Sequence, residues 1–185
     1  ERSRGLGDVY KRQEPIKLIS YNLRNSHGKD GDNVWMKRRH ATPEMIRREA
    51  PDVFGVQEGL IDQLHYIDAE CPQYARVGVG RDDGAEKGEF MAVYYLRDRF
   101  ELLDSGTFWL SETPDKVSRG WDGACNRTVT WVELKDRKSG KEFFYFNTHL
   151  DHKGKGATML ILGAILMIVC HLTLSLIHIS EPTRP

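Results

Sequence analysis

Polar side chains follow an aromatic stretch near residue 150 of this 185-residue chain. Residues 143–146 are all Phe or Tyr, whereas five of the six residues from Asn147 to His152 carry amide, hydroxyl, imidazole or carboxylate groups. Polar groups are costly in a buried strand unless they find partners. A site that handles phosphate and a metal ion needs such groups, so this segment is the first candidate for chemistry.

Two earlier apolar stretches end in the same way. Asn22 follows the stretch 16–21, and Glu58 lies just beyond the stretch 53–56. Pockets of layered α/β proteins often form where strand ends converge. A carboxylate there suits a hard cation such as Mg²⁺, and an amide can orient a phosphoryl oxygen or a metal-bound water. A histidine such as His149 can donate to phosphate or act as an acid or base.

Each residue alone also has a purely structural interpretation. Glu58 can be a first-turn helix residue that the helix dipole favours. Asn22 can be a turn former, and His149 can be a hydrogen-bonded core histidine. Composition and spacing therefore leave the function open.

The elements that must position these residues can be predicted from periodicity and turn signals. Pro43 marks either the start of the first predicted helix or a break within it, because proline is tolerated only in a first turn. Consecutive strands with short turns in the second half indicate antiparallel pairing. The fold class is α+β, with helices covering a mixed sheet. The predicted strands are 16–21, 53–56, 74–79, 90–96, 100–110, 128–134 and 142–150, and the helices 35–49 and 60–70.

Composition indicates one globular domain. The chain is 39% hydrophobic and 29% charged, and its formal net charge is zero. This balance lacks the basic footprint of a nucleic-acid-binding domain. The cysteines Cys71, Cys125 and Cys170 are odd in number and lack metal-type spacing, which argues against a disulfide framework or a zinc knuckle.

Both ends of the sequence look artificial. Residues 3–13 resemble the translation of a sequencing-library adapter, and residues 174–179 match the translation of its opposite strand. We therefore expect residues 1–13 and 174–185 to be adapter-like artefacts and exclude them from the fold. Natural terminal tails are the alternative. The compartment is left open, because the true N-terminus is expected to be missing.

The apolar run 157–173 precedes the second of these ends. With the adapter-like residues removed, its length is at the lower limit for spanning a bilayer. A core-packing helix is favoured over a membrane helix, and a reading-frame error near the junction would also produce such a run. A membrane partner is therefore not expected.

Three segments together resemble the endonuclease/exonuclease/phosphatase superfamily. They are Ile19–Arg24 (Ile-Ser-Tyr-Asn-Leu-Arg), Pro51–Glu58 (Pro-Asp-Val-Phe-Gly-Val-Gln-Glu) and Asn147–Leu150 (Asn-Thr-His-Leu), and they occur in the order of that superfamily's first motifs. Phe108–Pro114 and the extended 147–152 element resemble a bacterial branch. The resemblance covers about 14–156 and implies the N-terminal portion of a four-layer α/β sandwich with two mixed, largely antiparallel sheets.

The resemblance also implies roles. Glu58 would bind Mg²⁺, with Mn²⁺ as the other candidate ion, Asn22 would support the metal or phosphate, and His149 would contact the scissile phosphate. By weaker similarity, Glu89 would orient a catalytic histidine and Arg127 would clamp the phosphate; a solvated strand-start residue and a surface salt bridge are their alternatives. Further candidates for lining the substrate pocket are Asn147, Asp151, His152 and Trp121.

Later motifs of the superfamily, a Gly-Asp-x-Asn element and a terminal Ser-Asp-His element, are absent. We therefore expect residues 14–173 to be a truncated domain of a metal-dependent phosphoesterase whose substrate is a phosphodiester or phosphomonoester, small molecule or nucleic acid. For the chain as written, inactivity is expected. A catalytically inactive fragment and a membrane-anchored non-enzymatic domain are the alternatives, and no protein partner is predicted.

Overall fold

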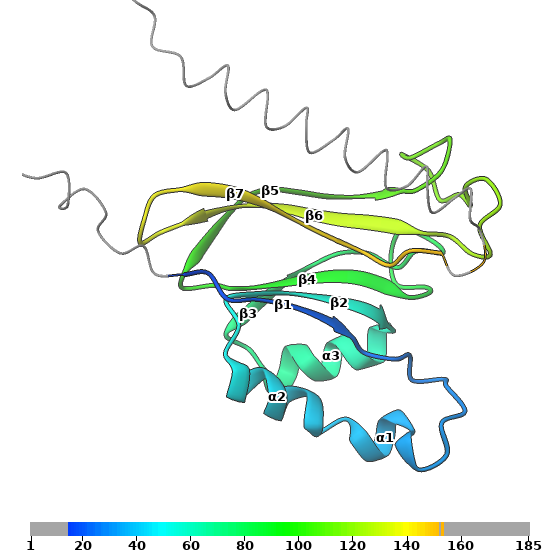
Figure 1. Ribbon diagram of the computed structural model, residues 1–185, viewed down its shortest axis with the longest axis horizontal. Coiled ribbons are helices and arrows are strands. Elements are labelled where there is room, and N and C mark those ends of the chain that lie inside the picture. Colours follow the sequence, from blue (N-terminus) through cyan, green and yellow to red (C-terminus); the bar gives the residue numbers. More distant parts are fainter. Residues whose placement is uncertain (1–14, 152, 154–185) are drawn as a thin grey trace, which may run out of the picture.

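The structure of the chain, a computed structural model, describes residues 15–151 and 153. It contains three layers: helices, a mixed four-stranded sheet and an antiparallel three-stranded sheet (Figure 1). In the mixed sheet the order is β1 (Leu18–Asn22), β2 (Val53–Gly59), β4 (Phe90–Leu96) and β3 (Tyr74–Val77), with β1 parallel to β2 and the other pairs antiparallel.

The second sheet is formed by three consecutive strands, β5 (Phe100–Trp109), β6 (Thr128–Asp136) and β7 (Glu142–Thr148). It stacks on one face of the mixed sheet, and the helices cover the other face (Figure 1). The helical elements are the 3₁₀ turn η2 (Gly31–Asn33), α1 (Trp35–Arg38), α2 (Ala41–Glu49) and α3 (Ile61–Glu70).

Alternation along β2 divides the core between the two interfaces, because successive side chains of a strand point to opposite faces. Phe54 and Val56 are buried in the cluster that includes helix residues Ile46 and Leu64. Val53 belongs instead to the cluster between the sheets, which includes Phe100, Val132 and Leu134 of the second sheet. A central strand that is buried on both faces has apolar residues at successive positions, which explains the continuous apolar stretch 53–56.

An ion-pair cluster joins the sheets at the end of the molecule where β2 begins. Arg99, just before β5, contacts Asp52 just before β2 (Nη1 to Oδ1, 2.6 Å) and Asp136 at the end of β6 (Nη2 to Oδ2, 3.6 Å). All three side chains are at most 13% exposed. The carboxylates therefore share one buried cation, which satisfies charges that would otherwise be costly to bury.

The predicted fold class is confirmed, and every strand and helix predicted within the described residues is present, with ends shifted by a few residues. The predicted helix 35–49 is divided into α1 and α2, so the break interpretation of Pro43 holds: it lies in the first turn of α2. No helix in the part of the chain that the structure describes is long and apolar enough to cross a membrane. Residues 1–13, 174–185 and the apolar run 157–173 lie outside the described residues.

Candidate active site

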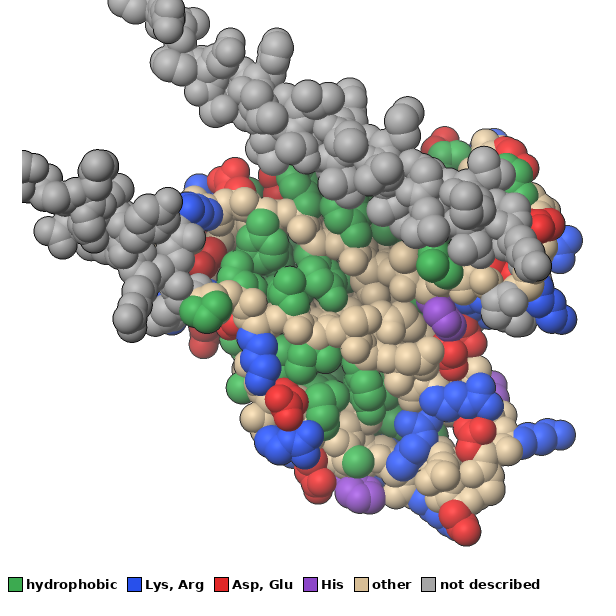
Figure 2. Space-filling view, viewed as in Figure 1, with side chains coloured by type: hydrophobic (Ala, Val, Ile, Leu, Met, Phe, Trp, Pro, Cys, Tyr) green, Lys and Arg blue, Asp and Glu red, His purple; other side chains and the backbone are tan. Residues whose placement is uncertain are grey.

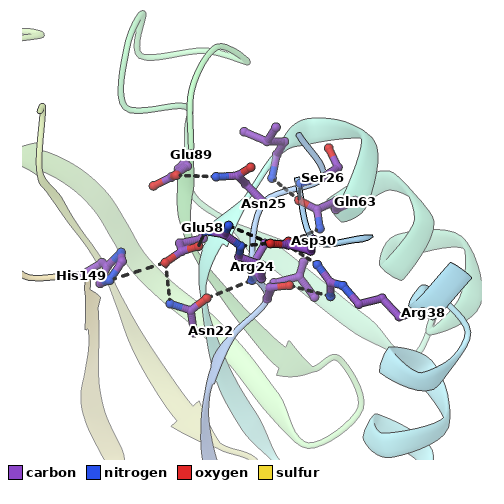
Figure 3. Close-up of polar contacts among 12 residues, drawn as sticks. Asn22, Arg24, Asn25, Ser26, Asp30, Arg38, Glu58, Gln63, Glu89 and His149 are labelled. Atoms are coloured by element: carbon purple, nitrogen blue, oxygen red, sulfur yellow. Dashed lines mark hydrogen bonds and ion pairs between the residues drawn. The ribbon is translucent and has the colours of Figure 1, made fainter. Parts of the chain in front are cut away.

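Glu58 lies at an irregular point of β2, close to the end of the neighbouring parallel strand β1. The register of β2 against β4 shifts between Val56 and Gly59, and the backbone of Glu58 has a φ of 60°. Bulges of this kind re-aim side chains beside active sites. A positive φ at a non-glycine residue is strained and persists only where the surroundings enforce it. The bulge therefore directs Glu58 to the strand ends (Figure 3).

The carboxylate of Glu58 is met by residues from two other strands. Asn22 at the end of β1 donates from Nδ2 to Oε1 (2.9 Å), and Nε2 of His149, one residue beyond β7, lies 3.9 Å from the same oxygen. The backbone N–H of Arg24 in turn donates to Oδ1 of Asn22 (2.9 Å), which sets the direction of its amide. The three residues that head the predicted site thus converge (Figure 3).

The second carboxylate oxygen, Oε2 of Glu58, is buried and has no hydrogen-bond partner. A buried carboxylate oxygen without a partner is costly, and a hard cation that prefers oxygen ligands would satisfy it. Among the described residues, no group of three or more His, Cys, Asp or Glu is arranged to hold a metal. Mg²⁺ does not need one, because it keeps several waters and takes only one or two protein carboxylates. The residues present therefore fit a bound Mg²⁺ held by Glu58.

The imidazole of His149 is half-buried, and its surroundings disfavour its charged form. Its burial, and then the nearby positive charge of Arg127, lower the pKa of His149 from 6.5, while the carboxylates of Glu58 and Glu89 act in the opposite direction. The imidazole is therefore neutral around pH 7. A neutral imidazole presents one N–H donor and one acceptor nitrogen.

Arg127 and Asp151 form a buried ion pair directly behind His149. Nε of Arg127 lies 3.3 Å from Oδ2 of Asp151, and the two side chains are 5% and 0% exposed. Asp151 also accepts hydrogen bonds from the backbone N–H groups of Ala124 (3.0 Å) and Lys153 (2.8 Å). Both residues were predicted to touch substrate; the structure places them beneath the site surface, with Nη1 of Arg127 3.3 Å from Nδ1 of His149.

Glu89, predicted to orient a histidine, makes other contacts. Its carboxylate accepts from Nη1 of Arg81 (2.5 Å) and from Nδ2 of Asn25 (3.1 Å). The described residue that meets the Nδ1 atom of His149 is Arg127. Glu89 is thus beside the site without a hydrogen bond to His149 in this structure, and its charge acts on the imidazole only at longer range.

A loop of polar residues after β1 forms the helix side of the site (Figure 3). Arg24 binds Asp30 through two nitrogens (3.0 and 2.9 Å), and its Nη1 lies 4.0 Å from Oε2 of Glu58. Gln63 of α3 holds the loop by donating to the carbonyl of Arg24 (3.0 Å) and accepting from the N–H of Ser26 (3.0 Å). None of these loop contacts was predicted from the sequence; the signal it offered was that Arg24 belongs to the first motif.

Asn147 lies between the sheets and away from the site surface. It is 4% exposed, its Nδ2 donates to the carbonyls of Val56 and Ala92 (both 2.8 Å), and its Oδ1 accepts from Nε2 of Gln57 (2.6 Å). Gly55 makes this approach possible, because a Cβ there would lie 2.7 Å from Cγ of Asn147. The amide of Asn147 is thus hydrogen-bonded to protein groups between the sheets. The sequence had predicted a contact with substrate for this residue.

Trp121 lies on the loop between β5 and β6 and is 39% exposed. It lines a pocket of about 370 Å³ whose other walls come from the end of β5 and the residues after it: Phe108, Trp109, Leu110, Ser111, Pro114 and Asp115. Leu110 of this wall donates its N–H to the carbonyl of Arg127 (2.7 Å), so the pocket adjoins the segment just before β6 that carries Arg127. His152 lies outside the described residues.

Charged side chains gather at this end of the molecule. The space-filling view shows acidic, basic and histidine side chains near the ends of β1 and β2, while apolar side chains lie toward the opposite end (Figure 2).

Comparison with known proteins agrees with this arrangement. No family model matches the chain. An endonuclease/exonuclease/phosphatase from Bacteroides vulgatus is 37% identical with a TM-score of 0.82, covering 85% of this chain and 61% of that one. The mannosyl-6-phosphatase Bt3783 of Bacteroides thetaiotaomicron is 39% identical with a TM-score of 0.82, covering 85% of this chain and 60% of that one.

A second Bacteroides thetaiotaomicron protein, of the endonuclease/exonuclease/phosphatase family, is 40% identical with a TM-score of 0.81, covering 85% of this chain and 58% of that one. An uncharacterized protein of Acanthamoeba polyphaga mimivirus is 26% identical over 124 residues, 63% of this chain and 46% of its own length. The chain thus spans about 60% of the solved structures it matches. Over the part that it shares with them, the chain resembles proteins of the endonuclease/exonuclease/phosphatase family in both sequence and fold.

Proposed function

We propose that the protein is a metal-dependent phosphoesterase and that this chain contributes Glu58, Asn22 and His149 to its site. The observation that carries the proposal is the buried Oε2 of Glu58, which has no hydrogen-bond partner, beside the Asn22 amide and the His149 imidazole. Similarity to phosphatases and nucleases of one family supports phosphoester chemistry in general. Because the chain spans about 60% of those structures, the activity of the whole protein is a proposal.

Each residue has a distinct task in this proposal. Mg²⁺, or Mn²⁺ in its place, would be held by Glu58 and would supply charge that polarises the phosphoryl group. Asn22 fixes one oxygen of the Glu58 carboxylate through its 2.9 Å hydrogen bond and leaves the other free to act as a ligand. His149 is neutral at pH 7 and can donate a hydrogen bond to a phosphate oxygen, where negative charge develops during attack by water.

The substrate class to test first is a sugar phosphate monoester. A relative of 39% identity is named as a mannosyl-6-phosphatase, and the pocket lined by Trp121, next to the segment that carries Arg127, offers an aromatic wall for a ring. Aromatic faces pack well against apolar surfaces of ligands. Phosphodiesters and nucleic acids are the competing substrates, and the same assay separates them.

The test is metal-dependent phosphate release from mannose 6-phosphate, an aryl phosphomonoester and an aryl phosphodiester. It is made on this chain and on the longest protein that its source gene encodes, each with and without Mg²⁺. In the longest encoded protein we expect hydrolysis that requires Mg²⁺ and falls by at least about 100-fold in Glu58→Gln, since that amide is a poor ligand for a hard cation. For the chain as written, no hydrolysis is expected. Glu44→Gln, on the exposed face of α2, is the matched control. Equal rates in the two variants would remove Glu58 from the site.

A further inference from the structure

The Arg127–His149 contact determines which nitrogen of the imidazole carries hydrogen. Nη1 of Arg127 lies 3.3 Å from Nδ1 of His149. An arginine side chain only donates hydrogen bonds and stays protonated at all ordinary pH values. For the contact to be a hydrogen bond, Nδ1 of His149 must be the acceptor, so this nitrogen carries no hydrogen.

The consequence appears on the other side of the ring. A neutral imidazole without hydrogen on Nδ1 has it on Nε2. Nε2 of His149 is the atom that lies 3.9 Å from Oε1 of Glu58, on the side of the ring that faces this carboxylate (Figure 3).

Asp151 completes the arrangement from beneath. A guanidinium that is 5% exposed needs a counter-ion, and the Asp151 carboxylate, 0% exposed, contacts its Nε at 3.3 Å. Asp151 is itself held by the N–H groups of Ala124 and Lys153. The buried carboxylate of Asp151 thereby helps to set the orientation of the guanidinium, whose Nη1 lies 3.3 Å from Nδ1 of His149.

We propose that Arg127 and Asp151 are positioning residues that hold His149 in the tautomer with hydrogen on Nε2, so that the ring serves as a hydrogen-bond donor toward the phosphate. The role of the ring as a donor to phosphate rests on the proposed function, whereas the assignment of the tautomer does not. It assigns Arg127 a different task from a direct phosphate clamp. In this proposal the imidazole is oriented by a cation, Arg127, whereas the sequence had suggested the carboxylate of Glu89.

The test is nitrogen NMR of the chain labelled with ¹⁵N in its histidine rings, with His149 assigned by the resonance lost in His149→Gln. In the unsubstituted chain at pH 7, we expect two widely separated His149 ring resonances, with the protonated nitrogen identified as Nε2 by its couplings. In Arg127→Met the two resonances should move toward each other, because the ring then exchanges between tautomers. Asp151→Asn, which keeps the shape of the side chain, should show part of the same change.

Arg76→Met is the matched control, because Arg76 of β3 forms a partly buried ion pair with Asp68 of α3, separate from the Arg127–Asp151 pair. It should leave the His149 resonances unchanged while lowering stability. Hydrogen found on Nδ1 in the unsubstituted chain, or unchanged resonances in both Arg127→Met and Asp151→Asn, would overturn the proposal. If Arg127→Met fails to fold, the unsubstituted chain and Asp151→Asn still decide.

Turnover supplies a second, separable readout. Where hydrolysis is observed, Arg127→Met should lower kcat by about 100-fold with little change in KM, as expected for loss of one oriented donor in the transition state. If the tautomer is as expected but no protein tested hydrolyses a phosphoester, the proposed function fails and the tautomer assignment stands. If hydrolysis is found with the opposite tautomer, only the positioning role fails.

Discussion

The side chain of Gln57 donates to Oδ1 of Asn147 at 2.6 Å, which joins residues 90 positions apart in the sequence. Gln57 lies next to Glu58 in the bulge of β2, and Asn147 lies two residues before His149. The hydrogen bond therefore fixes the spacing between the segment that carries the carboxylate and the segment that carries the imidazole. Neither side chain is part of the cluster formed by Glu58, Asn22 and His149. Each nevertheless lies in a segment that carries one member of that cluster.

We expect Asn147→Ala to lower the free energy of unfolding by about 2–4 kcal/mol, because it leaves the carbonyls of Val56 and Ala92 and the amide of Gln57 buried without partners. Urea denaturation measures the change. Asn33→Ala, at an exposed position in η2, should differ from the unsubstituted chain by no more than about 0.5 kcal/mol. Equal stabilities for the two variants would contradict the clamp between the sheets.

Much of the layered fold can be predicted from the sequence, because apolar periodicity and turn residues are local signals. The contacts that build the site are not local. The inward direction of Asn147 could have been inferred from alternation, since it shares a face with Phe143 and Tyr145, which pack between the sheets. The strained backbone of Glu58 has no sequence signal, because glutamate rarely adopts a positive φ.

The pairing of charged residues in the site was also not predicted, because these contacts join residues that are distant in the sequence. Arg127 and Glu89 were assigned roles from a weaker positional similarity to the superfamily, whereas their partners depend on how loops meet in space. Glu89 finds Arg81 and Asn25, and Arg127 finds Asp151 and His149. A motif identifies which residue types gather at a strand end; it does not determine which of them contact one another.

Stability should fall in acid partly through Asp136. Burial alone would raise its pKa, but hydrogen bonds from the N–H of Lys138 and the hydroxyl of Ser139, together with Arg99, outweigh burial and lower the pKa below 3.8. A carboxyl whose folded pKa is depressed stabilises the fold above its unfolded pKa, and that contribution is lost as pH falls through the folded value. The loss therefore begins below about pH 4.

Asp136→Asn should accordingly make the free energy of unfolding less dependent on pH below about pH 4, while lowering stability at pH 7. Urea denaturation at a series of pH values measures both effects. Asp98→Asn, at an exposed position beside Arg99, is the control and should retain the pH dependence of the unsubstituted chain. If Asp136→Asn follows the same pH curve as the control, the ion-pair cluster does not contribute.

Trp121 offers a test of substrate contact that stability does not confound. Because the side chain is 39% exposed, Trp121→Ala should change the melting temperature little. If the pocket receives the ring of the substrate, KM should rise by up to roughly tenfold, the size of one aromatic contact. Met36→Ala, at a side chain that is 66% exposed on α1, controls for loss of an exposed apolar group. An unchanged KM for every phosphoester that is hydrolysed would remove Trp121 from substrate binding.

Metal binding at Glu58 can be measured without turnover. A ligand that binds only the folded state raises the free energy of unfolding by about 2.7 kcal/mol at 100 times its Kd, which corresponds to an increase in melting temperature of roughly 5–10 °C for a domain of this size. We expect Mg²⁺ to produce this shift in the unsubstituted chain and in Glu44→Gln.

Glu58→Gln should lose the shift. Its melting temperature without Mg²⁺ should be equal to or above that of the unsubstituted chain, because the substitution removes a buried carboxylate oxygen that has no hydrogen-bond partner. The two outcomes distinguish a ligand from a structural residue: a structural glutamate would lower the melting temperature when replaced, whether or not Mg²⁺ is present. A Mg²⁺ shift of the same size in Glu58→Gln would place the ion elsewhere in the molecule.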